Sequence, residues 1–180
     1  MSMNALYSWD QYFMTMAYLI SMKSKDPSTR VGAVIVGKDH EIRSTGYNGL
    51  PRKVEDFSER YTEKDYKYYA CNHAEENAIL HCAKIGISTS GCILYTTWLP
   101  CSYCAKAIIQ VGIEKVIYHK YFPGVLQKQN GDFRSERWGR SMQISQELLL
   151  EAGVELVGFS DKLVRINGLY NGNVFSIYDL

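Results

Sequence analysis

His73-Ala74-Glu75 and Pro100-Cys101-Ser102-Tyr103-Cys104 bound the stretch of sequence, residues 73–104, that decides the fold. These two segments supply one imidazole, two thiols and a carboxyl group. Zinc accepts three protein ligands of this kind and can leave a fourth position for water. A water bound there has a pKa near ~7 and is a nucleophile at neutral pH. We therefore expect His73, Cys101 and Cys104 to hold one catalytic zinc ion, with Glu75 beside it to move protons.

Each half of this pattern is expected to open a helix. The sequence predicts one helix from His73 to Ile85, closed by Gly86, and another over residues 102–111, closed by Gly112. Two thiols three residues apart face the same way on a helical turn. A helix N-terminus carries positive partial charge, which favours thiolates. Two thiolates and a neutral imidazole would cancel the charge of the zinc ion.

The other three cysteines leave an alternative open. A lone His-x-Glu is common on helix surfaces, and a lone Cys-x-x-Cys also occurs in redox pairs and structural zinc sites. Cys71, Cys82 or Cys92 could complete a closed four-ligand site with Cys101 and Cys104. Cys82 and Cys92 stand in apolar segments typical of core residues, whereas Cys71 stands just before the first helix. The joint occurrence of both halves of the pattern favours the open, catalytic site.

The composition is typical of one intracellular domain. The chain has 180 residues, 46% of them hydrophobic, and a formal net charge of +1. This balance gives no broad attraction to nucleic acid or membranes, and no apolar run approaches the ~20 residues that cross a bilayer. The first ten residues lack signal-peptide features, and five cysteines indicate thiols or ligands in a reducing compartment. We expect a single domain over residues 1–180, located in the cytoplasm, that binds neither membrane nor nucleic acid.

The remaining elements alternate between strand and helix. Apolar residues at three- and four-residue spacing predict a first helix from Trp9 to Ile20, with Ser8 as its N-cap. Five strands are predicted over residues 30–37, 41–47, 92–96, 116–119 and 154–157, with a last helix over residues 142–152. This order predicts an α/β fold, a three-layer α/β/α sandwich around a mixed five-stranded sheet, in which the first two strands are antiparallel.

Three segments do not fit the alternation. Residues 50–72 are predicted to form an ordered, tyrosine-rich insertion without a strong period, and insertions of this length are usually functional or disordered. Residues 121–137 are predicted to be a polar loop. Residues 159–180 are predicted to be a tail that packs either on the body of the protein or on another subunit.

Motifs from Trp9 to about Gly158 resemble those of the cytidine deaminase superfamily and, within it, the deoxycytidylate (dCMP) deaminases. The paired His-x-Glu and Pro-Cys-x-x-Cys segments are the signature of zinc-dependent nucleobase deaminases. The narrower resemblance is carried by residues 25–36 (KDPSTRVGAVIV), 46–51 (GYNGLP), 73–79 (HAEENAI) and 104–110 (CAKAIIQ).

The resemblance implies the reaction dCMP + water → dUMP + ammonia, which supplies dUMP for dTMP synthesis. It implies that His73, Cys101 and Cys104 bind the zinc ion and that Glu75 carries out the proton transfers. It also suggests residues that contact the substrate dCMP: Arg30, Asn48, Ala74, Tyr118 and Tyr121. Arg30 would meet a phosphate and the Ala74 backbone the base carbonyl, while the two tyrosines would line the pocket. Arg30 is equally well explained as a surface residue, and the two tyrosines as core residues.

The resemblance further implies regulation and assembly. Many dCMP deaminases are hexamers, activated by dCTP and inhibited by dTTP. Their allosteric site involves the loop that here contains Gly46, Tyr47, Asn48 and Gly49, together with the insertion before the catalytic helix. We therefore expect a homo-oligomer, a hexamer, with both effectors and with Mg2+ accompanying the bound triphosphate. Residues 122–140 depart from the family in length and composition, and a second His and Cys set for an extra structural zinc is missing.

Other functions of the same fold compete with dCMP deamination. Related deaminases act on adenosine in transfer RNA, on free cytosine or on pteridine-like bases, and the near-neutral charge argues against an RNA substrate. A bifunctional enzyme would deaminate both dCMP and dCTP, and the sequence does not separate it from one specific for dCMP. A non-catalytic regulatory module could also keep the zinc fold, but the intact Glu75 argues against it.

Overall fold

The structure is a computed structural model that describes residues 6–120, 136–170 and 173–176. In this part of the chain, a five-stranded sheet has the strand order β2-β1-β3-β4-β5. Its strands are β1 (Gly32–Val36), β2 (Ile42–Tyr47), β3 (Ile93–Thr96), β4 (Lys115–His119) and β5 (Glu155–Phe159). β1 is antiparallel to both β2 and β3, whereas β3, β4 and β5 run parallel. The predicted mixed five-stranded sheet is confirmed.

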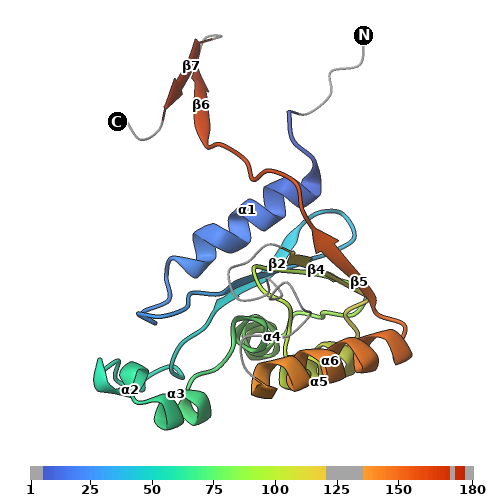
Figure 1. The fold of residues 1–180 in the computed structure, drawn as a ribbon. Helices are drawn as coiled ribbons and strands as arrows, with labels where there is room; N and C mark the ends of the chain where they lie inside the picture. Colours follow the sequence, from blue (N-terminus) through green and yellow to red (C-terminus); the bar gives the residue numbers. More distant parts are fainter. Residues whose placement is uncertain (1–5, 121–135, 171–172, 177–180) are drawn as a thin grey trace.

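Helices cover both faces of this sheet. α1 (Trp9–Ser21) lies on one face, and α4 (Ala74–Ile85), α5 (Ser102–Gln110) and α6 (Glu136–Glu151) lie on the other (Figure 1). The predicted N-cap of α1 is present, because Ser8 Oγ accepts a hydrogen bond from Gln11 N. The arrangement is the predicted three-layer α/β/α sandwich.

β1 is buried on both of its faces, which explains its continuous apolar sequence. Ala33 and Ile35 belong to the core beneath α4 and α5, while Val34 and Val36 belong to the core beneath α1. Gly32 allows α1 to approach closely, because a Cβ atom there would lie 2.0 Å from the Ala17 carbonyl oxygen. The two cores thus meet at the central strands and fix the register of the sheet.

The predicted insertion is more regular than its sequence indicates. It contains two short helices, α2 (Glu59–Thr62) and α3 (Lys64–Ala70). Tyr61 is buried, and its hydroxyl donates a hydrogen bond to Asp56 and accepts one from Leu50 N. Tyr61 therefore ties α2 to the start of the insertion, just after β2, without the periodic apolar face of a longer helix.

Two predicted boundaries were wrong. α6 begins at Glu136 and not at Met142, because Trp138 packs against Trp98 and adds an aromatic contact to a stretch that is otherwise polar. β5 continues to Phe159, whose side chain is buried in the core beneath α1. The rest of the predicted polar loop, residues 121–135, lies outside the described residues.

The predicted tail leaves the main sheet after β5. Its first part packs on α1, where Gln11 Nε2 donates to Lys162 O and Val164 N donates to Thr15 Oγ1. β6 (Asn167–Tyr170) and β7 (Asn173–Ser176) then form a separate antiparallel pair beyond α1 (Figure 1). Among the helices that the structure describes, none has the length and apolar character required to span a membrane.

Candidate metal centre

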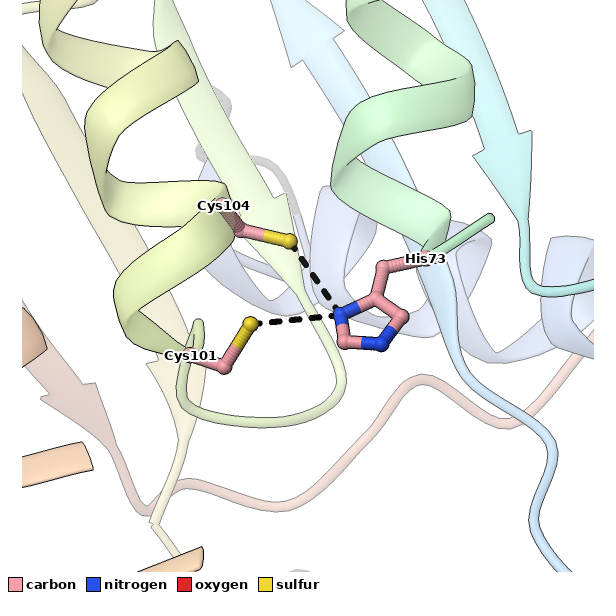
Figure 2. A group of neighbouring side chains, drawn as sticks. All are labelled: His73, Cys101 and Cys104. Carbon is pink, nitrogen blue, oxygen red and sulfur yellow. Dashed lines mark hydrogen bonds between the residues drawn. The ribbon is translucent and has the colours of Figure 1, made fainter. Parts of the chain in front are cut away.

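His73 and Cys101 occupy equivalent places in two helices. His73 is the N-cap of α4 and Cys101 is the N-cap of α5, and both have extended backbone conformations. Cys104 lies one turn further along α5. The imidazole ring and the two thiols therefore point into the space between the two helix starts, where Figure 2 shows them facing one another.

The separations between the three side chains fit zinc. His73 Nδ1 lies 3.3 Å from Cys101 Sγ and 3.4 Å from Cys104 Sγ, and the three donor atoms lie within 4.8 Å of one another. Zn–S bonds of about 2.3 Å and Zn–N bonds of about 2.0–2.1 Å meet at tetrahedral angles, so nitrogen and sulfur ligands lie about 3.6 Å apart. The observed separations agree with this value to a few tenths of an ångström.

The other cysteines do not close the site. Within the residues that the structure describes, the grouped donors are His73, Cys101 and Cys104, and no fourth His, Cys, Asp or Glu joins them. Cys82 and Cys92 are buried in the core beneath α4. Cys71 lines the cavity beside these donors but is not one of the grouped donors. A set of three protein donors is the arrangement of zinc sites that keep a position for water.

The three donors share their protons unevenly when no metal is bound. Hydrogen bonds from Cys104 and from His73, together with the charge of His73, lower the pKa of Cys101 to about 4. The hydrogen bond to Cys101 and burial raise the pKa of Cys104. Burial disfavours the charged form of His73, but the hydrogen bond to Cys101 and its charge raise the pKa of His73 to about 9. The lowered pKa of Cys101 and the raised pKa values of Cys104 and His73 favour ionisation of Cys101 before Cys104, with the proton kept on the imidazole.

Glu75 stands beside the donors in the first turn of α4. Its side chain is 3% exposed, and Thr96 on β3 donates a hydrogen bond of 3.2 Å to its Oε1. The other oxygen, Oε2, lies 3.7 Å from Cys104 Sγ. Burial raises the pKa of Glu75. A carboxyl group with a raised pKa, fixed through one oxygen and facing the metal donors through the other, is suited to proton transfer.

A cavity of about 160 Å³ opens over this site. Predicted site residues that line it are His73, Ala74, Glu75, Cys101 and Asn48. The side chain of Asn48 also braces the segment that precedes β1. Its Oδ1 accepts a hydrogen bond from Val31 N (2.8 Å), and its Nδ2 donates to Thr29 O (2.9 Å).

Two predicted substrate contacts lie away from the cavity. The side chain of Arg30 is exposed, and its Nε donates to the Asp26 carbonyl oxygen at 3.4 Å. Tyr118 lies at the end of β4 beside Gly158, where a Cβ atom would be 3.4 Å from its hydroxyl. Neither residue is among those that line the cavity. Tyr121 lies outside the described residues.

The loop that contains Gly46, Tyr47, Asn48 and Gly49 is fastened to the start of α4. A Cβ atom at Gly46 would lie 2.1 Å from the Ala74 carbonyl oxygen. Asn77 Nδ2 donates to Tyr47 O at 2.8 Å. Gly49 and Asn72 exchange two backbone hydrogen bonds of 3.1 Å and 2.9 Å. The loop therefore supports the backbone that positions His73.

Several residues of the cavity were not predicted from the sequence: Asp26, Ser28, Lys67, Tyr68, Trp98 and Trp138. Trp138 forms an aromatic wall, with its ring centroid 6.0 Å from that of Trp98 and 6.2 Å from that of His73. Trp138 could have been noticed in the sequence, because it is one of only three tryptophans in the chain and stands in a polar segment. Lys67 carried no such signal, because the insertion is rich in charged residues.

An α/β sandwich with a His-Cys-Cys donor set at two helix starts and a buried glutamate beside it defines the class of zinc-binding nucleobase deaminases. Comparison with known proteins gives the family. Residues 7–120 match the family model described as the cytidine and deoxycytidylate deaminase zinc-binding region. The chain belongs to this family.

The relatives include deaminases from bacteria, animals and a phage. An uncharacterized deaminase of Aliivibrio fischeri is 45% identical over 148 residues, which is 82% of this chain and 91% of that protein. The deoxycytidylate deaminase of Homo sapiens is 44% identical over 116 residues, covering 61% of this chain and 64% of that protein. The chain thus matches less than two thirds of the human protein's length.

Among solved structures, the dCMP deaminase of cyanophage S-TIM5, in complex with dCMP and dUMP, superimposes with a TM-score of 0.61 and 28% identity. The match covers 83% of this chain and 95% of the phage protein. The similarity therefore extends beyond the metal-binding motifs to most of the fold.

Proposed function

We propose that the chain is a zinc-dependent deaminase that converts dCMP and water into dUMP and ammonia. The observation that carries this proposal is the group formed by His73, Cys101 and Cys104, with Glu75 Oε2 3.7 Å from Cys104 Sγ. The choice of substrate is supported by the relatives named deoxycytidylate deaminase and by the phage enzyme that binds dCMP and dUMP.

In this proposal each residue of the site has a definite task. His73, Cys101 and Cys104 hold the zinc ion, and bound zinc supplies a water molecule that is activated at neutral pH. Glu75 accepts one proton from the attacking water and passes it to the ring nitrogen beside the reacting carbon as the water oxygen adds to that carbon. Glu75 then takes the second proton, from the hydroxyl group so formed, and gives it to the amine, and the carbon–nitrogen bond breaks as the carbonyl group forms. The hydrogen bond from Thr96 keeps Glu75 in one orientation throughout.

The cavity walls orient the pyrimidine ring and exclude bulk water. Trp98, Leu99 and Trp138 form an apolar and aromatic side of the cavity, suited to a planar base. In this proposal the backbone of Ala74, in the first turn of α4, binds the base carbonyl and Asn48 contacts the nucleotide. Both roles are supported by the position of these residues in the cavity lining.

One substitution tests the chemistry. We expect Glu75→Gln to keep the fold and the zinc content but to abolish ammonia release from dCMP. Glu147→Gln, which changes an exposed glutamate on α6, is the matched control and should leave turnover unchanged. Ammonia release from dCMP, dCTP, deoxycytidine and cytosine, measured on one zinc-loaded sample, tests the choice of substrate. Near-normal turnover by Glu75→Gln would refute the mechanism.

Regulation and assembly form part of the same proposal. We propose a homohexamer whose deaminase activity is raised by dCTP, bound with Mg2+, and lowered by dTTP. The supply of dUMP for dTMP synthesis would then be adjusted to the levels of these two nucleotides. The proposal is supported by the bonds from Tyr47 and Gly49 to the region of His73, because a ligand that moved this loop would reach the metal donors. Rates measured against dCMP concentration with each triphosphate test it. Superimposable hyperbolic rate curves with and without each triphosphate would refute the proposed regulation.

We also propose the reducing cytoplasm as the compartment of the enzyme. The two ligand thiols must stay reduced to bind zinc, and a reducing compartment maintains them. Fractionation of cells, followed by detection of the protein and of dCMP deamination in each fraction, tests this location.

A further inference from the structure

We propose that Lys67, which the insertion contributes, binds the 5′-phosphate of the substrate and so makes the enzyme selective for a nucleotide over a nucleoside. The inference rests on the proposed function, in which the cavity receives a cytosine deoxynucleotide. It gives the insertion before α4 a direct task at the substrate.

The cavity has a polar part formed by Asp26, Ser28, Thr29 and Lys67. Lys67 Nζ lies 2.6 Å from Ser28 Oγ and 2.7 Å from Asp26 Oδ2. Among the described residues that line the cavity, Lys67 is the one lysine or arginine. A phosphate group needs a cation, and the Lys67 ammonium group supplies one here, held by the Ser28 hydroxyl, which in turn donates a hydrogen bond to Asp26 Oδ1 (2.9 Å).

Asp26 positions Lys67 and does not simply neutralise it. The Asp26 carboxylate also accepts hydrogen bonds from Ser28 N (2.8 Å), Thr29 N (3.1 Å) and Asn48 Nδ2 (3.2 Å). Burial opposes its charge, but the bonds from Lys67, Ser28 and Thr29 outweigh burial and lower the pKa of Asp26. The side chain of Asp26 is 1% exposed, whereas that of Lys67 is 17% exposed. An entering ligand therefore meets the ammonium group before the carboxylate.

The other nearby cations are placed differently. Arg30 is exposed and lies outside the cavity lining. Lys25 is also exposed, and it pairs with Asp56 outside the cavity. The same cavity contains His73 and Glu75, so a ligand whose ring reaches Glu75 lies in the space that Lys67 lines. Among the described lysines and arginines, Lys67 is thus the one that lines the same cavity as His73 and Glu75.

The test compares dCMP with deoxycytidine on the zinc-loaded enzyme. We expect Lys67→Met to lower kcat/KM for dCMP by about 10- to 100-fold, the effect of one charge-assisted hydrogen bond, and to leave kcat/KM for deoxycytidine unchanged. Lys67→Arg should restore part of the preference for dCMP. Lys25→Met removes a paired lysine outside the cavity and should change neither value. If Lys67→Met lowered both values by the same factor, or neither, the proposal would be overturned.

A second comparison separates phosphate binding from a purely structural tether. The Lys67–Asp26 pair joins α3 to the segment before β1, so either Lys67→Met or Asp26→Asn breaks it. Asp26→Asn keeps the ammonium group and an amide oxygen that can still accept a hydrogen bond from it, so this variant should keep most of the preference for dCMP over deoxycytidine. The double variant Asp26→Asn/Lys67→Met leaves no unpaired buried charge and should still lose that preference. Loss of the preference in Asp26→Asn alone, to the same extent as in Lys67→Met, would mean that Lys67 only tethers α3.

Product binding distinguishes failure of this inference from failure of the proposed function. Calorimetry on the zinc-loaded protein should show tighter binding of dUMP than of deoxyuridine, with the difference lost in Lys67→Met. If that result came with no turnover of dCMP, the inference would stand and the proposed function would fail. If dCMP were turned over but the advantage of dUMP did not depend on Lys67, the inference would fail and the function would stand.

Discussion

Zinc binding should release two protons from the site between about pH 5 and pH 6, where a zinc-bound water with a pKa near ~7 keeps its proton. In the metal-free protein the pKa of Cys101 is about 4, so this thiol is already ionised. The pKa of His73 is about 9 and that of Cys104 is also raised, so both must lose a proton to become ligands. The affinity for zinc should therefore rise about 100-fold for each unit of pH across this range, and fall by the same factor as the pH decreases.

Independent ligands would behave differently at the acidic end. A histidine of pKa about 6.5 and two cysteines of pKa about 8.5 would all be protonated near pH 5.5, so that about three protons would be released. Titration calorimetry in buffers of different ionisation enthalpy counts the protons directly. Glu75→Gln is the control, because it removes any proton that the Glu75 carboxyl would lose on metal binding. A count of three in this variant near pH 5.5 would refute the claim that Cys101 is a thiolate in the metal-free protein.

Two further predictions follow from contacts around the site. Thr96→Val keeps the shape of the side chain but removes the hydrogen bond to Glu75 Oε1, so kcat for dCMP should fall about 10-fold with zinc content unchanged. Thr45→Val on β2 is the control, and equal rates for both variants would contradict the assigned task of Thr96. Gly46→Ala places a Cβ atom 2.1 Å from Ala74 O and should lower the free energy of unfolding by about 1–3 kcal/mol in denaturant titrations. The Cβ atom of Gly49→Ala would lie 3.7 Å from its nearest neighbour, so this substitution should lower the free energy of unfolding less than Gly46→Ala. A larger loss of stability for Gly49→Ala than for Gly46→Ala would show that β2 and α4 can move apart at little cost in free energy.

The metal-binding pattern could be predicted from the sequence because its geometry is local. The three-residue spacing of Cys101 and Cys104 puts both thiols on one helical turn whatever surrounds the helix. His73 and Cys101 each precede a helix that is closed by a glycine, and Gly86 and Gly112 do have positive φ angles. A β-branched run likewise identified β1 before any contact was known.

The other residues of the cavity come together through contacts between distant segments, and the sequence carried little trace of these contacts. The contact between Lys67 and Asp26 joins the insertion to the segment before β1, and the contact between Trp98 and Trp138 joins the approach to α5 with the start of α6. Arg30 stood out because it adjoins a recognisable strand, whereas the fold directs it to solvent.

The class of fold and the grouping of His73, Cys101 and Cys104 with Glu75 beside them could be predicted from the sequence, because helix starts and ligand spacing depend on neighbours a few residues away. The strand order, the short helices of the insertion and the charged and aromatic residues that surround the cavity depend on long-range contacts and became known only from the folded structure. Those features depend on which segments, far apart in the chain, exclude water from each other, and hydrophobic periodicity records that a residue is buried but not what buries it.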